Sequence, residues 1–141
     1  PYADREQARA KIEEMRASAT TGDALPWAIA DAADTLVGMV TLHRIDPGNG
    51  RAEIGYLLAR PLWGRGLAAE AASLAIDHAF GPLGLRRLEA DIDPRNTASA
   101  RLLERLGFVR EGLLRERWQV AGEISDTAFY GLLAREWSAR R

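Results

Sequence analysis

The chain has no cysteine and only two histidines among its 141 residues. Without cysteine there is no disulfide framework, thiol nucleophile or cysteine zinc site. The two histidines, His43 and His78, lie too far apart in the sequence to predict a histidine-rich metal site. We therefore expect no bound metal. The absence of cysteine is typical of a reducing compartment, so we expect a cytoplasmic protein.

Net charge and long hydrophobic runs are also lacking. The 19 basic and 20 acidic residues leave a formal charge of −1, which removes the usual electrostatic argument for a nucleic-acid or anionic-membrane partner. The longest charge-free apolar stretch, 35–42, is far shorter than the roughly 18 residues that a membrane span needs. Residues 1–22 are charged throughout, unlike a signal peptide. We expect a soluble protein that binds neither nucleic acid nor membranes.

What is present suits one globular domain over 1–141, because 47% of the residues are apolar and the length allows a single core. Hydrophobic periodicity and turn residues predict the elements in chain order. They are a helix over 4–18, strands over 27–30, 36–44 and 51–58, a helix over 67–80, a strand over 86–92, a helix over 97–106, and strands over 108–118 and 126–133. This order predicts an α/β (α+β) domain with a mixed, mostly antiparallel sheet of about six strands flanked by helices. One helical crossover makes two of the strands parallel.

Gly64 and Gly66 join a strand to the helix over 67–80. Glycines let a backbone approach a ligand closely, and a helix start offers free amides, so the turn is a candidate phosphate site or simply a tight connection. No Gly-Lys-Ser/Thr follows, which excludes a Walker loop. With Ala69 the spacing also fits a dinucleotide fingerprint. Against that interpretation, the preceding strand belongs to an antiparallel meander, and 59–63 separates it from the glycines.

Asn96 follows Asp-Pro-Arg at the start of a helix, where it is a good N-cap for the amide of Ser99. Ser99 also shares a helical stripe with the leucines of that helix, so its hydroxyl should face inward. An inward hydroxyl needs a partner, which can be a local hydrogen bond or a ligand.

Glu53 shares a strand face with Gly55 and Leu57. A carboxylate beside a residue without a side chain leaves room for a substrate. The simpler alternative is an exposed or arginine-paired glutamate. His43 and His78 are rival bases, but their positions favour structural roles for both.

Four segments, in this order, resemble the GNAT acetyltransferase superfamily, and most closely its RimJ/RimL branch. They are EIGYLL (53–58), PLWGRGLAAEA (61–71), DPRNTAS (93–99) and LLERLGF (102–108). The likeness covers about 27–137 and implies a GNAT-like sheet. Family members usually begin with a further strand and helix, which we expect to be missing before Pro1. The branch acetylates protein N-terminal amines and includes relatives that act on small amines.

The resemblance implies acetyl-CoA as cofactor. The amides from Arg65 to Ala68 would hold the CoA pyrophosphate, and the backbone from Tyr56 to Leu58 would pair with the pantetheine arm. The implied cofactor-binding residues are Tyr56, Leu57, Leu58, Trp63, Gly64, Arg65, Gly66, Leu67, Ala68, Asn96 and Ser99. Trp63 stands where the wider superfamily usually has Gln or Arg, which is typical of the RimJ/RimL branch. The change leaves the phosphate to backbone amides, with the Arg65 side chain as a further candidate contact.

The implied function is N-acetyl transfer to a primary amine, such as a peptide N-terminus, a polyamine or another small amine, by direct attack on the thioester. Glu53 is the candidate base. Many family members carry a tyrosine acid seven residues after the asparagine, where this chain has Leu103, so Ser99 or a water it holds is the candidate replacement. A catalytically weak acyl-CoA-binding module and a dinucleotide-binding oxidoreductase are the alternatives. A homo-oligomer remains open, because dimer faces leave no motif.

Overall fold

The computed structural model describes residues 5–140. The helices are α1 (Arg5–Thr21), the 3-10 helix η1 (Arg60–Leu62), α2 (Leu67–Phe80), α3 (Thr97–Leu106) and α4 (Ala134–Ala139). The strands are β1 (Ala24–Ala30), β2 (Leu36–Asp46), β3 (Arg51–Leu58), β4 (Arg87–Ile92), β5 (Val109–Val120) and β6 (Glu123–Leu133). Among these residues no helix combines the length and apolar character needed to cross a membrane.

The strands form one six-stranded sheet in the order β1-β2-β3-β4-β6-β5. The pair β3–β4 is parallel and every other pair is antiparallel. Helix α2 supplies the crossover that a parallel pair requires. The predicted mixed, mostly antiparallel sheet is therefore confirmed.

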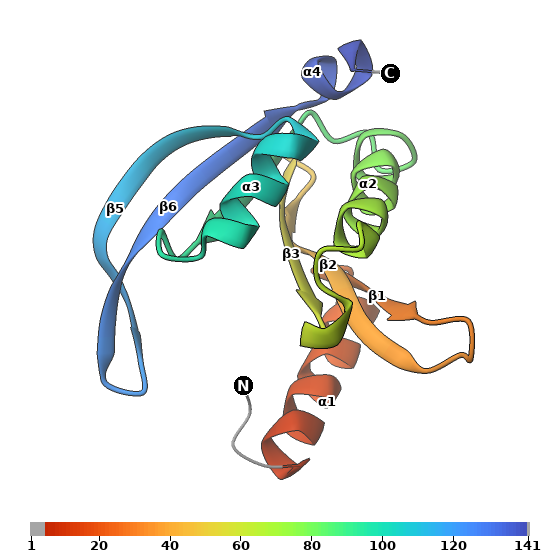
Figure 1. Ribbon diagram of the computed structural model, residues 1–141. Coiled ribbons are helices and arrows are strands. Elements are labelled where there is room, and N and C mark those ends of the chain that lie inside the picture. Colours follow the sequence, from red (N-terminus) through yellow and green to blue (C-terminus); the bar gives the residue numbers. More distant parts are fainter. Residues whose placement is uncertain (1–4, 141) are drawn as a thin grey trace.

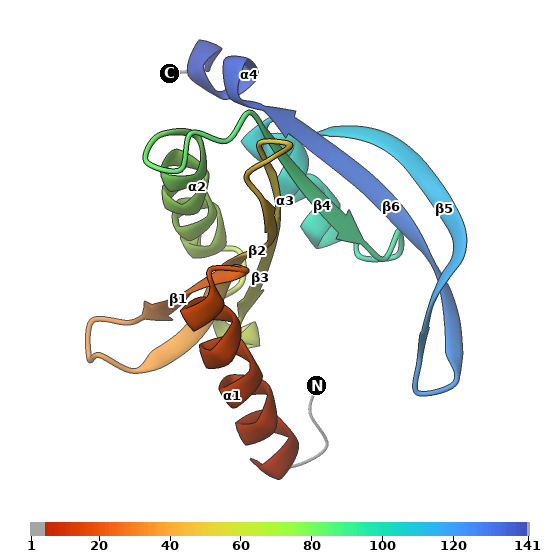
Figure 2. The same ribbon diagram turned by 180° about the vertical axis from the view of Figure 1, so that it is seen from behind.

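The parallel ladder between β3 and β4 is short. It holds three registered pairs and ends where Glu53 stands opposite Glu89. Beyond that point β3 stays paired with β2 as far as Leu58, while β4 stays paired with β6 as far as Ile92. The two strands diverge, as Figure 2 shows. The β4-facing edge of β3 is thus left without a strand partner over 54–58, which opens a fork in the sheet.

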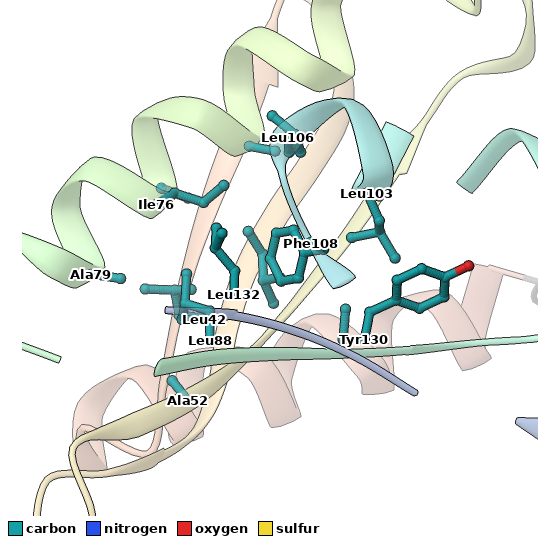
Figure 3. Packing of buried hydrophobic residues seen from close by; sticks show 14 of the residues in the cluster. Leu42, Ala52, Ile76, Ala79, Leu88, Leu103, Leu106, Phe108, Tyr130 and Leu132 are labelled. Atoms are coloured by element: carbon teal, nitrogen blue, oxygen red, sulfur yellow. The ribbon is translucent and has the colours of Figure 1, made fainter. Parts of the chain in front are cut away.

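Helices α2 and α3 cover one face of the sheet, here called the α2/α3 face (Figure 1). Helix α1 lies across the opposite face beside β1 (Figure 2). The core fills the α2/α3 face, because alternate residues of the central strands point to it, such as Ala52 and Ile54 of β3, both at most 4% exposed. Figure 3 shows Ile76, Leu103 and Phe108 packed over Leu88 and Leu132. Burial of these side chains is the main stabilising contribution to the fold.

Three predicted boundaries were wrong by three residues each: the end of α1, the start of β1, which is Ala24 rather than Trp27, and the start of β6. Helix α1 runs to Thr21 rather than ending at Ser18. The apolar stripe predicted for this helix is not buried at Ile12, whose side chain is 44% exposed. The side chains of Ala8 and Met15, the other two members of the stripe, lie outside the described residues. Strand β6 starts at Glu123 rather than Asp126, because the β5–β6 ribbon extends past the core and carries no burial pattern there.

Helix α4 was not predicted. It is only six residues long, too short for a periodic signal, and it begins where the Glu136 carboxylate accepts a hydrogen bond from the Leu133 amide at 3.0 Å. Its Trp137 is 9% exposed and donates to the Asp77 carboxylate of α2 at 2.8 Å. A contact between distant segments, rather than local propensity, holds this helix.

Candidate functional site

A cleft of about 400 Å³ opens on the α2/α3 face beside the fork. Its walls come from the end of β3, from the turn before α2, and from the first turns of α3. The lining residues are Tyr56, Leu57, Leu58, Leu62, Trp63, Gly64, Gly66, Leu67, Ala68, Ala69, Asn96, Ala98, Ser99, Arg101, Leu102 and Arg105. All but one of the predicted cofactor-binding residues are among them. The exception is Arg65, which does not line the cleft.

The glycine turn has the conformation that only glycine adopts readily. Gly64 and Gly66 have φ values of 75° and 80°, and Gly66 is the N-cap of α2 without any side-chain capping bond. The first amides of α2 have no intrahelical acceptor and lie at the cleft wall with Leu67 and Ala68. A Cβ at either glycine would meet nothing within 4 Å, so the space beside the turn is open. An anion fits here sterically and electrostatically.

Strand β3, which precedes this turn, belongs to a parallel unit, whereas the sequence placed it only in the antiparallel meander. The predicted gap between strand and glycines exists, since η1 occupies it. However, β3 also starts a parallel β3–α2–β4 unit, so its membership of the antiparallel meander is no argument against a dinucleotide site. The same strand belongs to both arrangements because the sheet is mixed.

Trp63 holds the turn against the end of β3. Its indole Nε1 donates to the Leu58 carbonyl oxygen at 2.8 Å, and the Arg60 guanidinium lies 5.6 Å from the ring centroid. The ring is 55% exposed. The tryptophan therefore fixes the backbone that leads to the glycines, and it also lines the cleft.

Asn96 caps α3, as predicted. Its Oδ1 accepts a hydrogen bond from the Ser99 amide at 3.1 Å. The Ser99 carbonyl oxygen in turn accepts from the Tyr56 hydroxyl at 3.4 Å, and burial raises the pKa of Tyr56, which keeps this phenol protonated. The Ser99 hydroxyl makes no hydrogen bond to any other described residue, and the residue lines the cleft. The sequence left a local hydrogen bond or a ligand as the partner of this hydroxyl, and within residues 5–140 the local hydrogen bond is absent.

Leu103, at the position of the family's tyrosine acid, is fully buried and does not reach the cleft. Figure 3 shows it above Tyr130, whose hydroxyl points away from the packed side chains. The leucine belongs to the core, so the chemistry of the cleft must use other groups.

Two arginines of α3 were missed by the sequence reasoning. Arg101 and Arg105 line the wall opposite the glycine turn and bring positive charge to the cleft. The signal was available, because residues four apart share one helix face and Asn96 marks the start of that helix. Sequence alone does not say, however, which face of α3 looks toward the turn.

Glu53 lies on the opposite face of the sheet and does not line the cleft. Its side chain is 12% exposed. Its Oε1 accepts from the Arg44 guanidinium at 2.9 Å, and its Oε2 lies 3.9 Å from Nδ1 of His43. The arginine-paired alternative is therefore the one observed. The sequence predicted free space beside Gly55. The His43 ring borders that space, because its Nε2 would lie 3.6 Å from a Cβ added at Gly55.

The other histidine has a packing role. His78 of α2 meets Trp27 of β1 edge-on, with ring centroids 5.3 Å apart. This contact lies away from Glu53 and agrees with the structural interpretation of His78. His43, in contrast, sits at the candidate site.

A second group of ion pairs lies on the same face as Glu53. Glu89, 8% exposed, accepts from Arg87 at 2.8 Å and from Arg51 at 3.3 Å. Arg87 also binds Glu111 through two bonds of 3.0 and 2.6 Å, which lowers the pKa of Glu111. No three His, Asp or Glu side chains within residues 5–140 converge to hold a metal. These carboxylates are partnered by arginines instead.

The forked sheet and its cleft agree with the comparison with known families. The model of the "Acetyltransferase (GNAT) domain" matches residues 1–109. Fold and match together define the class of protein, an acetyl-CoA-dependent N-acetyltransferase. The chain belongs to the GNAT acetyltransferase family.

Individual relatives agree with this assignment. The chain is 40% identical to the N-acetyltransferase p20 of Bacillus licheniformis, covering 98% of this chain and 78% of that protein. It is 30% identical to spermidine N(1)-acetyltransferase of Vibrio cholerae over 71% of this chain and 58% of that one. Its structure resembles that of Mycobacterium smegmatis RimJ in complex with CoA-disulfide, with a TM-score of 0.84 and 32% identity over 93% of this chain and 63% of that one.

The predicted superfamily and its RimJ-like branch are thus confirmed, and acetyl-CoA or CoA is the cosubstrate. The dinucleotide-binding oxidoreductase is replaced by this assignment. The roles of the individual site residues stay predictions.

Proposed function

We propose that the cleft holds acetyl-CoA while a primary amine approaches from the opposite face, where Glu53 removes its proton. The observation that carries this proposal is the end of the parallel ladder at Glu53 and Glu89. There the sheet opens between the cleft on one face and a carboxylate on the other. Two substrates can therefore meet through the fork without crossing a continuous sheet.

The cleft residues fit a diphosphate followed by a long amide-containing arm. The amides from Arg65 to Ala68 sit at a helix N-terminus, where negative charge is favoured. Arg101 and Arg105 add positive charge from the facing wall. These groups would hold the diphosphate without help from the Arg65 side chain, which does not line the cleft.

The unpaired edge of β3 fits the rest of the cofactor. The Ala59 amide donates to Val37 of β2, so the alternation along β3 turns the backbone groups of Leu57 to β2 and those of Tyr56 to the fork, where they have no strand partner. A pantetheine arm can pair there like an added strand. Leu57, 66% exposed, and Leu102 provide apolar lining. Asn96 stands at the same edge, with its amide nitrogen not used by the cap.

Acetyl-CoA supplies an activated acetyl group, and the residues of this chain supply position and proton transfer. An α-amine with a pKa near 7.7 to 8.0, or a lysine-type amine near 10.4, arrives mostly as an ammonium ion. Glu53, directly or through water, accepts that proton. The amine nitrogen then bonds to the acetyl carbon and the carbon–sulfur bond breaks. The nitrogen gives up its second proton, and Ser99 or a water held by it passes a proton to the leaving sulfur and takes the nitrogen's proton in return.

The acceptor is a primary amine of one of two kinds. The spermidine N(1)-acetyltransferase among the relatives supports a polyamine, and the likeness to RimJ supports a peptide N-terminus. Both arrive as cations at neutral pH. The Glu53 carboxylate on the opposite face can pair with either one.

The test is thiol release from acetyl-CoA in the presence of spermidine, an alanine-terminated peptide and an aminoglycoside. At least one of these should give turnover, and Glu53→Gln should lower kcat by about 10²-fold to 10⁴-fold, the usual contribution of a positioned base. The same variant should bind CoA as the wild type does in calorimetry. Glu104→Gln, which removes an exposed carboxylate of α3, is the matched control and should keep full activity.

The alternative outcomes are distinct. Binding of CoA without turnover on any amine would favour the acyl-CoA-binding module. Turnover that survives in Glu53→Gln would remove Glu53 from the mechanism while leaving the cofactor site intact. Absence of CoA binding would contradict the whole proposal.

A further inference from the structure

Arg44 reaches Glu53 only because the backbone of β2 is irregular. The register between β2 and β3 shifts between His43 and Asp46, and Arg44 has a φ of 48°. In a regular strand, Arg44 would point away from the face that His43 shares with Glu53. The bulge turns it back, so that both side chains flank the same carboxylate.

This conformation is costly for a residue other than glycine. The left-handed region disfavours side chains with a Cβ by roughly 1–2 kcal/mol, and such positions persist where the surrounding structure holds them. Here the strained residue is Arg44, and its conformation brings its guanidinium to the Glu53 carboxylate. The irregularity therefore points to a role for the pair of Arg44 and Glu53.

The two partners differ in exposure. The Glu53 side chain is 12% exposed and that of Arg44 is 57% exposed. The guanidinium is thus the solvent-facing cover of an enclosed carboxylate, and its long side chain is free to turn outward. Exposed ion pairs of this kind hold weakly. Asp91 of β4 also attracts Arg44 electrostatically, so the displaced cation would still have an acidic neighbour.

An incoming ammonium ion needs the same oxygen. Oε1 of Glu53 accepts from Arg44 at 2.9 Å, in the position that the N–H of an ammonium group would take, while Oε2 lies 3.9 Å from Nδ1 of His43, beyond hydrogen-bond distance. We infer that Arg44 occupies the place of the acceptor's ammonium group at Glu53 and is displaced by the acceptor on binding. This inference rests on the proposed function, and it makes Arg44 a specificity-determining residue that favours strongly cationic acceptors.

Removal of the Arg44 charge should relieve this competition. In Arg44→Gln, the KM for the acceptor should fall about twofold to fivefold, the range that corresponds to one exposed ion pair. The kcat should stay near the wild-type value because Glu53 is intact. The KM for acetyl-CoA should not change, because the cleft lies on the other face. Both spermidine and the alanine-terminated peptide are to be tested as acceptors.

Two further variants separate the loss of the Arg44 charge from other effects of substitution. Arg44→Gly removes the charge and suits the positive φ, so it should lower the acceptor KM equally and raise the melting temperature. Arg51→Gln is the matched control, since Arg51 is 47% exposed on the same face and pairs with Glu89 rather than Glu53. Its acceptor KM should equal that of the wild type.

The outcomes separate the two proposals. A higher acceptor KM or a lower kcat in Arg44→Gln and Arg44→Gly would show that Arg44 positions Glu53, and would overturn the competition. Unchanged constants in both variants, with an inactive Glu53→Gln, would also overturn it while the proposed function stands. Absence of turnover in the wild type with spermidine, the peptide and the aminoglycoside would overturn both proposals.

Discussion

Glu53 and Glu89 stand opposite each other as the last registered pair of the parallel ladder between β3 and β4. Both are glutamates of the opposite face, and both are held by arginines, Glu53 by Arg44 and Glu89 by Arg51 and Arg87. Two adjacent carboxylates would repel each other without these partners. The point where the sheet opens is therefore also the point where its ionisable groups gather.

The glycine turn allows a direct test of the diphosphate site. Gly66→Ala should weaken CoA binding at least tenfold, because the new methyl group would project into the open space beside the α2 amides. Calorimetry with CoA measures this change. Gly122→Ala is the control, since Gly122 has the same φ of 80° and the same free space but lies in the β5–β6 turn. Both variants should lose about 1–2 kcal/mol of stability. Equal CoA affinities in the two would place the diphosphate elsewhere.

Asn96 combines a structural role with a proposed cofactor contact, and two variants separate them. Asn96→Ala should cost about 1 kcal/mol of unfolding free energy in urea, because the Ser99 amide loses its acceptor. Asn96→Asp keeps a capping oxygen and should unfold within about 0.5 kcal/mol of the wild type. If the amide nitrogen of Asn96 contacts pantetheine, the aspartate variant should nevertheless bind CoA more weakly. Full affinity in that variant would limit Asn96 to the cap.

Because Gly131 has no side chain, the Arg87–Glu111 ion pair can lie directly beside its Cα. A Cβ there would lie 2.6 Å from Oε1 of Glu111 and 2.7 Å from NH1 of Arg87. Gly131→Ala should therefore cost about 1–3 kcal/mol, as overpacking usually does. In Gly131→Ala with Glu111→Ala one of the two close groups is gone, and Arg87, without its Glu111 bonds, can turn away from the methyl group, so the two losses should not add. Additive losses in thermal unfolding would mean that the ion pair moves aside at no cost.

The loop before α3 predicts a pH dependence in acid. Arg95 lowers the pKa of Asp93 from 3.8 to about 2 through side-chain and backbone hydrogen bonds. A carboxylate with a lowered folded pKa stabilises the protein above its unfolded pKa, and that contribution is lost as the pH falls toward 2. The stability difference between wild type and Asp93→Asn should therefore be full at pH 5 and shrink toward pH 2. A difference that stays constant over this range, measured by urea unfolding, would contradict the assignment.

Much of the site was predictable from short segments. Left-handed glycines before a helix, an asparagine three residues before the amide it caps, and alternating faces along a strand are local properties of the chain. For that reason the cleft gathers all but one of the residues expected to bind the cofactor. Arg65 is the exception, because it is exposed in the turn and does not line the cleft.

Other features required distant segments to meet. Arg101 and Arg105 reach the cleft because α3 packs beside α2, and no local pattern tells which helix faces will look at each other. Helix α4 depends on the bond between Trp137 and Asp77. Such contacts join residues far apart in the chain, so they leave no periodic signal.

The order of helices and strands, the phosphate turn and the α3 cap follow from neighbouring residues alone, since backbone propensity and side-chain period act over a few positions. The arginine partner of Glu53 and the fork beside it do not. Arg44 meets that carboxylate through a bulge in β2, and the fork opens because β3 and β4 each keep a different antiparallel neighbour. Both depend on how the strands register against one another, which is settled only when the whole sheet assembles and its core is buried.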